Sequence, residues 1–150
     1  MAYRRKTWNE KMEPPIEPKI EVDPKTGLPT FYATPRMVAA EVKRVRKGRL
    51  ITPSMIRERL AVANGAADTS PITTGIFLTI LSGAVEEDLA EGRKPQAPYW
   101  RVVEDNGRLR VKNRAGVERQ RELLEAEGHV IEPQGRAGKL TVVDFEKRLA

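Results

Sequence analysis

The fold of this 150-residue chain is indicated by one short stretch, Pro98-Tyr99-Trp100-Arg101-Val102. An Asn-Gly pair follows at 106–107, and a helical pattern then closes on the sequence Leu-Leu-Glu-Ala-Glu-Gly-His at 123–129. Asn-Gly tolerates the positive φ angles of a tight hairpin turn, so strands are expected at 100–104 and 108–111. We interpret the rest of the chain outward from this succession of a Pro-x-x-Arg-Val segment at 98–102, called the box below, a hairpin and a helix.

Three helices are expected before the box, because each candidate opens with a Ser or Thr cap followed by proline at the first helical position. They begin at Thr34-Pro35, Thr52-Pro53 and Ser70-Pro71, and the first two are expected to end at Gly48 and Asn64-Gly65. The last two helices, joined by a short turn that contains glycine, form a helix-turn-helix, and a hairpin after that motif makes it winged.

A fourth helix is expected over 117–127, where the apolar residues recur at helical spacing, and one more short strand over 140–143. We therefore predict an α+β fold for residues 34–150. Its architecture is a winged helix-turn-helix with a C-terminal helix and a short strand.

Residues 1–33 are predicted to form a basic, proline-rich arm that is mostly extended or disordered. Five prolines in this segment break every possible helix. Residues 20–22 alternate weakly and suit a single edge strand. Trp8 is the residue expected to pin the arm to the domain.

The net charge of +6 is unevenly distributed, because residues 1–60 carry 14 Lys and Arg against 7 Asp and Glu. A basic first third attracts a polyanion, through counterion release if that polyanion is nucleic acid. Charges that only solvate a helix face and a tail would give the same count. Both interpretations stay open on charge alone.

Composition argues against several kinds of site. The chain has no cysteine, so it forms neither disulfides nor thiolate metal sites. A single histidine, His129, argues against a histidine-based metal centre or a catalytic triad. No apolar run is long enough to cross a bilayer, and the first residues are polar. We therefore expect a cytoplasmic protein without a secretory signal, membrane association, metal or cofactor.

The order of motifs over residues 36–132 resembles the C-terminal DNA-binding domain of the O6-alkylguanine DNA alkyltransferases. In that family a Pro-Cys-His-Arg-Val box carries the alkyl-accepting thiolate. Here Tyr99 stands at the cysteine position and Trp100 at the histidine position, and Gln120 and the Leu-Leu and Glu-Gly pairs follow in order. The chain is most similar to the alkyltransferase-like proteins, the non-enzymatic group in which the cysteine is replaced.

This resemblance implies a non-catalytic DNA-binding protein that is not an enzyme and has alkylated guanine in duplex DNA as a candidate ligand for repair. It places Tyr99 and Trp100 in the pocket that receives an extruded base. Neither ring is a useful alkyl acceptor at neutral pH, because a phenol titrates near 10 and an indole nitrogen only donates. The two rings either stack on an extruded base or plug the vacated pocket.

The third helix corresponds to the helix that enters the minor groove in the family, and Thr73, Thr74 and Gly75 are its candidate DNA contacts. The family arginine that replaces the extruded base matches a position near Thr74, and no arginine is within reach. Along this helix the sequence shows both an apolar stripe, at Ile72, Ile76, Ile80 and Ala84, and a small polar face, at Thr73, Thr74, Gly75, Thr79 and Ser82.

Further DNA contacts are expected from the cap of the second helix and from the basic end of the first. Thr52 can cap its helix and touch a phosphate, and Arg101 orders the turn of the box in the family. The basic residues expected to dock the duplex electrostatically are Lys43, Arg44 and Lys47.

Two other functions stay open. A protein-interaction module on a degenerate alkyltransferase scaffold, with a repair protein as one candidate partner, is favoured by the missing family residues and by the acidic run at 86–88. An enzyme with a different nucleophile has no His, Cys or carboxylate cluster to support it.

Overall fold

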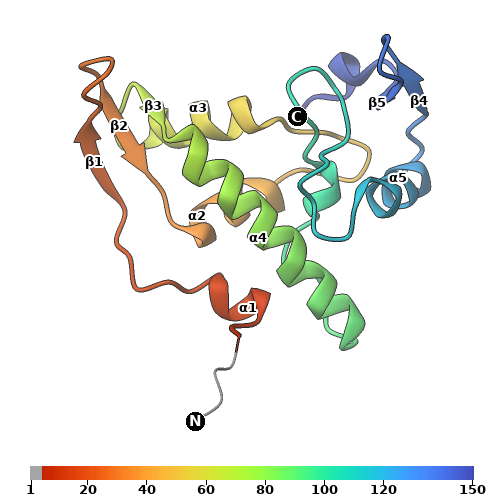
Figure 1. Cartoon of the computed structure of the whole chain (residues 1–150), viewed down its shortest axis with the longest axis horizontal. Coiled ribbons are helices and arrows are strands. Elements are labelled where there is room, and N and C mark those ends of the chain that lie inside the picture. Colours follow the sequence, from red (N-terminus) through yellow and green to blue (C-terminus); the bar gives the residue numbers. More distant parts are fainter. Residues whose placement is uncertain (1–4) are drawn as a thin grey trace.

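The computed structural model describes residues 5–150, and residues 1–4, where the predicted arm begins, lie outside the described part. The long helix α4 (Pro71–Ala90) crosses the middle of the molecule (Figure 1). Helices α2 (Pro35–Lys43) and α3 (Pro53–Asn64) pack against it. Short strands lie at both ends of the molecule, which gives the mixed α+β architecture that the sequence predicts.

The three central helices begin where the sequence predicts them. The side chains of Thr34, Thr52 and Ser70 each accept a hydrogen bond from a backbone N–H in the first helical turn, and a proline follows each cap. Gly65 ends α3 with a φ angle of 69°, a conformation that glycine adopts without steric cost. Helix α2 stops at Lys43, earlier than the predicted end.

Residues 5–33, predicted as a loosely held arm, form regular elements. Strand β1 (Lys19–Val22) pairs antiparallel with β2 (Pro29–Tyr32), which pairs in parallel with the short β3 (Asp68–Thr69). Helix α1 (Trp8–Lys11) packs against α4, where a Cβ at Gly83 would overlap the Trp8 ring. Trp8 therefore pins this segment to the domain, as the sequence indicated.

The C-terminal part follows a 3-10 turn, η1 (Tyr99–Arg101). Helix α5 (Val117–Ala126) confirms the fourth predicted helix. Strand β5 (Lys139–Val142) confirms the short predicted strand and pairs antiparallel with β4 (Ile131–Gln134), which the sequence did not indicate. A last 3-10 turn, η2, spans Phe145–Arg148.

The prediction of two hairpin strands at 100–104 and 108–111 is wrong. The turn at its tip does form, closed by a hydrogen bond from Glu104 N to Arg108 O, but the two arms do not pair further. The side chain of Gln120 lies between them, accepting from Arg110 N at 2.9 Å and donating to Val102 O at 2.8 Å. This amide bonds backbone groups of both arms, and Val103 N and Leu109 N donate to Ile51 O and Leu140 O instead of across the hairpin, so the arms form no β-ladder.

Two hydrophobic cores meet at the box. One lies among α2, α3 and α4 and includes Tyr99 and Val102. The other lies under α5 and the β4–β5 hairpin and includes Leu124 and Val142. Trp100 packs against both cores, so the box joins the two halves of the molecule.

Candidate nucleic-acid interface

The N-terminal half of α4 exposes apolar side chains. Ile72 is 77% exposed and Ile76 is 51% exposed. Thr74 is buried instead, and its Oγ1 donates to Ser70 O at 2.8 Å. The small polar face read from the sequence is therefore turned partly inward, with Thr73 and Gly75 half-buried at the edge of the outer face.

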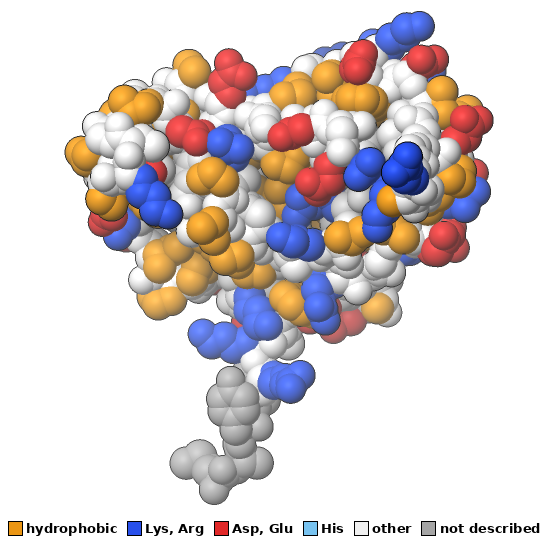
Figure 2. Space-filling model, turned by 45° about the horizontal axis from the view of Figure 1, so that its top comes forward, with side chains coloured by type: hydrophobic (Ala, Val, Ile, Leu, Met, Phe, Trp, Pro, Cys, Tyr) orange, Lys and Arg blue, Asp and Glu red, His pale blue; other side chains and the backbone are white. Residues whose placement is uncertain are grey.

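A hollow of about 620 Å³ runs along this outer face. Figure 2 shows Lys and Arg side chains interspersed with hydrophobic side chains across the face of the molecule that it displays. The lining of the hollow is apolar and basic, and comes from α1, α4 and the segment before α5: Trp8, Lys11, Pro71, Ile72, Gly75, Ile76, Thr79, Ile80 and Lys112.

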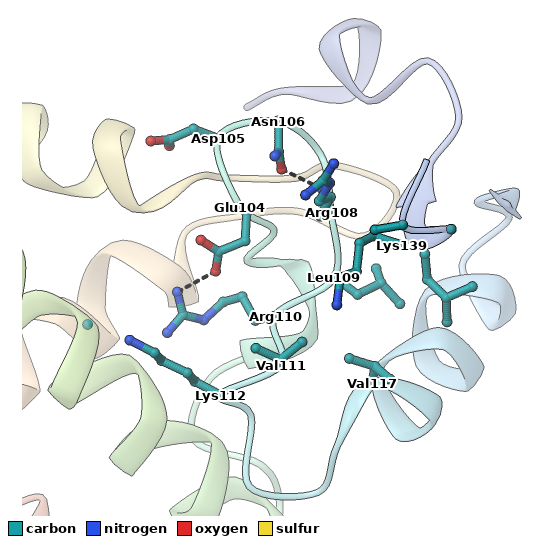
Figure 3. Close-up of a pocket in the computed structure, with 14 residues that line it drawn as sticks. Glu104, Asp105, Asn106, Arg108, Leu109, Arg110, Val111, Lys112, Val117 and Lys139 are labelled. Carbon is teal, nitrogen blue, oxygen red and sulfur yellow. Dashed lines mark hydrogen bonds and ion pairs between the residues drawn. The ribbon is translucent and has the colours of Figure 1, made fainter. Parts of the chain in front are cut away.

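A second cavity of about 760 Å³ lies between Gly75 of α4, the loop 104–112 and residues 137–140 of the β4–β5 hairpin. Figure 3 shows Arg110 and Lys112 extending from the loop toward α4. Gly75 and Lys112 line both cavities, so the outer face of α4 lies between the two.

The basic residues beside α4 are not those that the sequence suggested. Lys11 and Arg114 both lie over the ring of Trp8, at 4.0 and 4.8 Å from its centre. Lys11 and Lys112 line the hollow beside the exposed end of α4, whereas the backbone N–H of Arg114 donates to Ser82 Oγ at 3.0 Å, farther along the helix. For Lys112 and Arg114, the signal in the sequence is that every second residue from 108 to 114 is Lys or Arg.

Arg110, within that run, faces the interior. Its side chain is 5% exposed, and its Nη1 donates to Glu104 at 2.8 Å. Burial lowers the pKa of Arg110, and the Glu104 carboxylate opposes that effect. Among the alternating basic residues, Arg110 therefore pairs within the loop and is not exposed at the surface.

Tyr99 is buried and Trp100 is half-buried, and neither lines either of the two cavities beside α4. Tyr99 is 2% exposed, and its hydroxyl donates to Glu86 at 2.9 Å. Burial, and then the Glu86 carboxylate, raise the pKa of Tyr99 far above its ordinary value, so the phenol stays protonated. The two rings meet edge to face at 5.6 Å between centroids. The sequence left two roles open for these rings, stacking on an extruded base or plugging the vacated pocket, and this placement is compatible with the second.

Glu127 holds the box from the end of α5. Its carboxylate accepts from Trp100 Nε1 at 2.8 Å, from Arg101 Nη2 at 2.8 Å and from Gly48 N at 3.1 Å. Burial alone would raise the pKa of Glu127, but the bonds from Arg101, Trp100 and Gly48 outweigh it and the pKa lies below its ordinary value. Arg101 also donates to Val45 O at 2.6 Å, so its guanidinium is turned inward.

Thr52 is buried as the cap of α3, where its Oγ1 accepts from Met55 N at 3.3 Å. Beside it, Asp105 of the loop points to α3 (Figure 3) and accepts from Ser54 N at 3.3 Å and from Ser54 Oγ at 2.6 Å. The N-terminus of α3, a position that favours anions, therefore already holds a carboxylate of the chain itself.

Lys43, Arg44 and Lys47 are exposed at the end of α2 and just after it, and none lines either cavity. Arg44 lies 3.6 Å from Glu41. The bond from Gly48 to Glu127 places this segment beside the end of α5.

The acidic run at 86–88 contacts other parts of the chain. Glu86 accepts from Tyr99, and Glu87 accepts from the backbone N–H groups of Trp8 and Asn9 at 2.8 and 2.9 Å, which caps α1. Asp88 is 4% exposed and accepts from Gln96, Arg93 and Asn9. These carboxylates anchor neighbouring segments to α4.

Within residues 5–150, no group of His, Cys, Asp or Glu is arranged to hold a metal ion. Across the same residues, no helix combines the length and apolar character needed to cross a bilayer.

No protein-family model and no curated protein sequence matches the chain. Among solved structures, S. pombe Atl1 in complex with damaged DNA containing O6-carboxymethylguanine matches with a TM-score of 0.54, at 18% identity over 77% of this chain and 93% of that chain. The chain has the fold of an alkyltransferase-like protein. S. pombe ATL in complex with DNA matches with a TM-score of 0.52, at the same identity and coverage. The resemblance read from residues 36–132 is thus confirmed at the level of the fold.

Proposed function

We propose that the protein is a non-catalytic DNA-binding protein of the alkyltransferase-like kind, which places the outer face of α4 in the minor groove of duplex DNA. The observation that carries this proposal is the exposed end of α4, bordered by Lys11 and Lys112 with Arg114 over the neighbouring Trp8 ring, on a fold shared with proteins crystallised on DNA. Cations around a protruding helix attract the phosphates on both sides of a groove, and each contact releases counterions.

In this arrangement α3 and α4 act as the helix-turn-helix, and the loop 104–112 takes the place of the wing. We assign the phosphate contacts to Lys11, Lys112 and Arg114 in place of Lys43, Arg44 and Lys47, which line neither cavity beside α4. Thr73 and Gly75 remain candidate contacts on α4, because both lie at its outer face.

Recognition of O6-alkylguanine for repair is a finer part of the proposal. It is supported by the damaged DNA in the complex of S. pombe Atl1. Because Tyr99 is buried and neither Tyr99 nor Trp100 lines a cavity beside α4, an extruded base would enter the cavity between Gly75 and the loop 104–112. That cavity presents Arg108, Lys112 and Lys139 to the lesion.

The absence of catalysis follows from the acceptor position. The chain has no cysteine, and the residue standing there is a buried phenol whose pKa is raised. A protonated phenol bonded to a carboxylate is not a nucleophile at neutral pH. We therefore expect no transfer of an alkyl group to the protein, which intact mass after incubation with alkylated DNA would verify.

A protein-interaction module on the same scaffold is the second candidate function. The exposure of Ile72 and Ile76 favours it, because apolar side chains next to a hollow suit an apolar partner surface. Capture of a protein partner that withstands high salt, with no binding to DNA, would select this function.

Fluorescence anisotropy tests the proposal with duplexes that carry plain guanine or O6-methylguanine, at about 50 and 200 mM salt. We expect binding to both duplexes at low salt, weakening steeply at the higher concentration. Tighter binding to the O6-methylguanine duplex would support damage recognition, and equal binding would leave a non-specific DNA-binding protein. No binding to either duplex would end the DNA proposal.

A further inference from the structure

Ile72 and Ile76 are one helical turn apart on α4 and both project into solvent. Single exposed apolar residues are common on protein surfaces. These two differ because they share one hollow with Ile80, Pro71 and the Trp8 ring, and no residue between 5 and 150 covers them. The fold thus leaves a ridge of two isoleucines on its most prominent helix.

Gly75 lies between these isoleucines and has no internal reason to be glycine. A Cβ built there meets nothing within 4 Å, and its φ angle is that of an ordinary helix. Glycine destabilises a helix interior relative to alanine, so a bare position on an outer face indicates close approach by something outside the chain.

The charges around the ridge indicate what approaches. Lys11 and Lys112 line the hollow, Arg114 lies over Trp8 beside it, and no Asp or Glu is among the residues described as lining it. Apolar protein surfaces do not require this basic border, whereas a groove between two rows of phosphates does. The occupant that fits both the apolar ridge and its border is duplex DNA.

We propose that Ile72 and Ile76 form a wedge that enters the minor groove and pushes between two stacked base pairs, kinking the duplex at the binding site. Apolar side chains inserted from the minor groove partly unstack a base step and bend DNA toward the major groove. The inference rests on the proposed function and deepens it. It explains how α4 acts although it carries no arginine, and it predicts a preference for pyrimidine–purine steps, which unstack most easily.

The test joins three measurements on the full chain with a 25-base-pair duplex: affinity by anisotropy, end-to-end distance by fluorescence transfer between dyes on the two ends, and unstacking by 2-aminopurine placed at a central TA step. The variants are Ile76→Ala and Ile72→Ala. Val62→Ala is the matched control, because Val62 is 76% exposed on α3 and lines neither cavity beside α4.

We expect the wild-type protein to shorten the end-to-end distance and to raise 2-aminopurine fluorescence severalfold. Ile76→Ala should weaken binding about tenfold and abolish both signals, since the buried area of one isoleucine is lost. Its salt slope should stay unchanged, because no phosphate contact is removed. Val62→Ala should bind and bend DNA like the wild type.

Gly75→Ala adds a readout that a purely structural role would not move. It should raise the melting temperature of the free protein, because alanine favours the helix, and should weaken DNA binding, because the added methyl group keeps the groove away.

The outcomes separate the wedge from the function on which it rests. Binding without bending or unstacking, with Ile76→Ala as tight as the wild type, would overturn the wedge and leave the DNA-binding function standing. Failure of the wild type to bind any duplex would overturn both, and capture of a protein partner through Ile72 and Ile76 would then identify the ridge as a protein-docking surface.

Discussion

Replacement of Glu127 by glutamine should destabilise the protein strongly although it changes only one atom. The carboxylate is 8% exposed, and its ion-pair partner Arg101 is 14% exposed. It accepts from Arg101, Trp100 and Gly48 at once. Glutamine offers one acceptor oxygen where two are used, directs its NH2 group at donors, and leaves the Arg101 charge without its partner.

Removal of one member of a buried ion pair costs about 3–5 kcal/mol, because the other charge stays desolvated. For a chain of this length we expect the melting temperature to fall by about 10 °C, at about 2–4 °C for each kcal/mol. In urea denaturation at pH 7, the same loss in the free energy of unfolding should appear as a lower midpoint concentration with an unchanged m-value.

The pH dependence has a definite sign. The pKa of Glu127 lies below its ordinary value of 4.5 in the folded protein. Its contribution to stability is therefore complete above that value and is lost as the pH falls through the lower pKa of the folded state. The difference in free energy of unfolding between the wild type and Glu127→Gln should become smaller over that pH range, since the wild-type carboxyl then also becomes neutral.

Glu125→Gln is the control at the same end of α5. Glu125 is 48% exposed and pairs with Arg121 one turn away, so its loss should cost less than about 0.5 kcal/mol. If the free energy of unfolding of Glu127→Gln lies within about 0.5 kcal/mol of the wild-type value, as expected for Glu125→Gln, the structural role given to the Glu127 carboxylate is refuted.

Three other positions test the packing of the box, the packing of α1 and the proposed DNA contact. Gln120→Leu should lower the free energy of unfolding by about 2–4 kcal/mol in urea denaturation, because it leaves Arg110 N–H and the carbonyl of Val102 buried without partners; an effect below 1 kcal/mol would contradict this. Gly83→Ala should displace the Trp8 ring and release α1, which an increase in iodide-quenchable tryptophan fluorescence would report and unchanged quenching would exclude. Lys112→Ala should reduce the slope of log affinity against log salt by about 1, and an unchanged slope would remove Lys112 from the phosphate contacts.

The helices that support the site are predictable because their signals are local. A hydroxyl cap and a following proline act within one turn, so Thr34, Thr52 and Ser70 mark the starts of three helices whatever the rest of the chain does. The cap geometry in the structure matches these expectations closely. The resemblance to a known fold rests on the order of such local signals.

The hairpin was mispredicted because its outcome depends on a residue far along the chain. Asn106-Gly107 does make the turn, but Gln120 of α5, Ile51 and Leu140 supply hydrogen bonds that the two arms would otherwise exchange. No pattern within 100–111 reveals that substitution of a side-chain amide for a β-ladder. The same holds for β2 and β3, whose parallel pairing joins segments 29–32 and 68–69.

The orientation of α4 could not be read from periodicity either, because the helix is apolar on two sides. Leu78, Leu81 and Val85 face the core, and Ile72 and Ile76 face outward. A stripe of isoleucines and a stripe of leucines and valines give equally good helical spacing, and only the packing of α2 and α3 decides between them. The basic residues beside the exposed end likewise come from α1 and from the segment before α5, far apart in the sequence.

The most direct test of the proposed contact between α4 and DNA is a map of the protein's amide chemical shifts by NMR as a duplex is added. If the outer face of α4 enters the groove, the largest changes will fall on residues 71–79, on 110–114 and around Lys11. Changes confined to residues 43–49 at the end of α2, or none at saturating DNA, would contradict it.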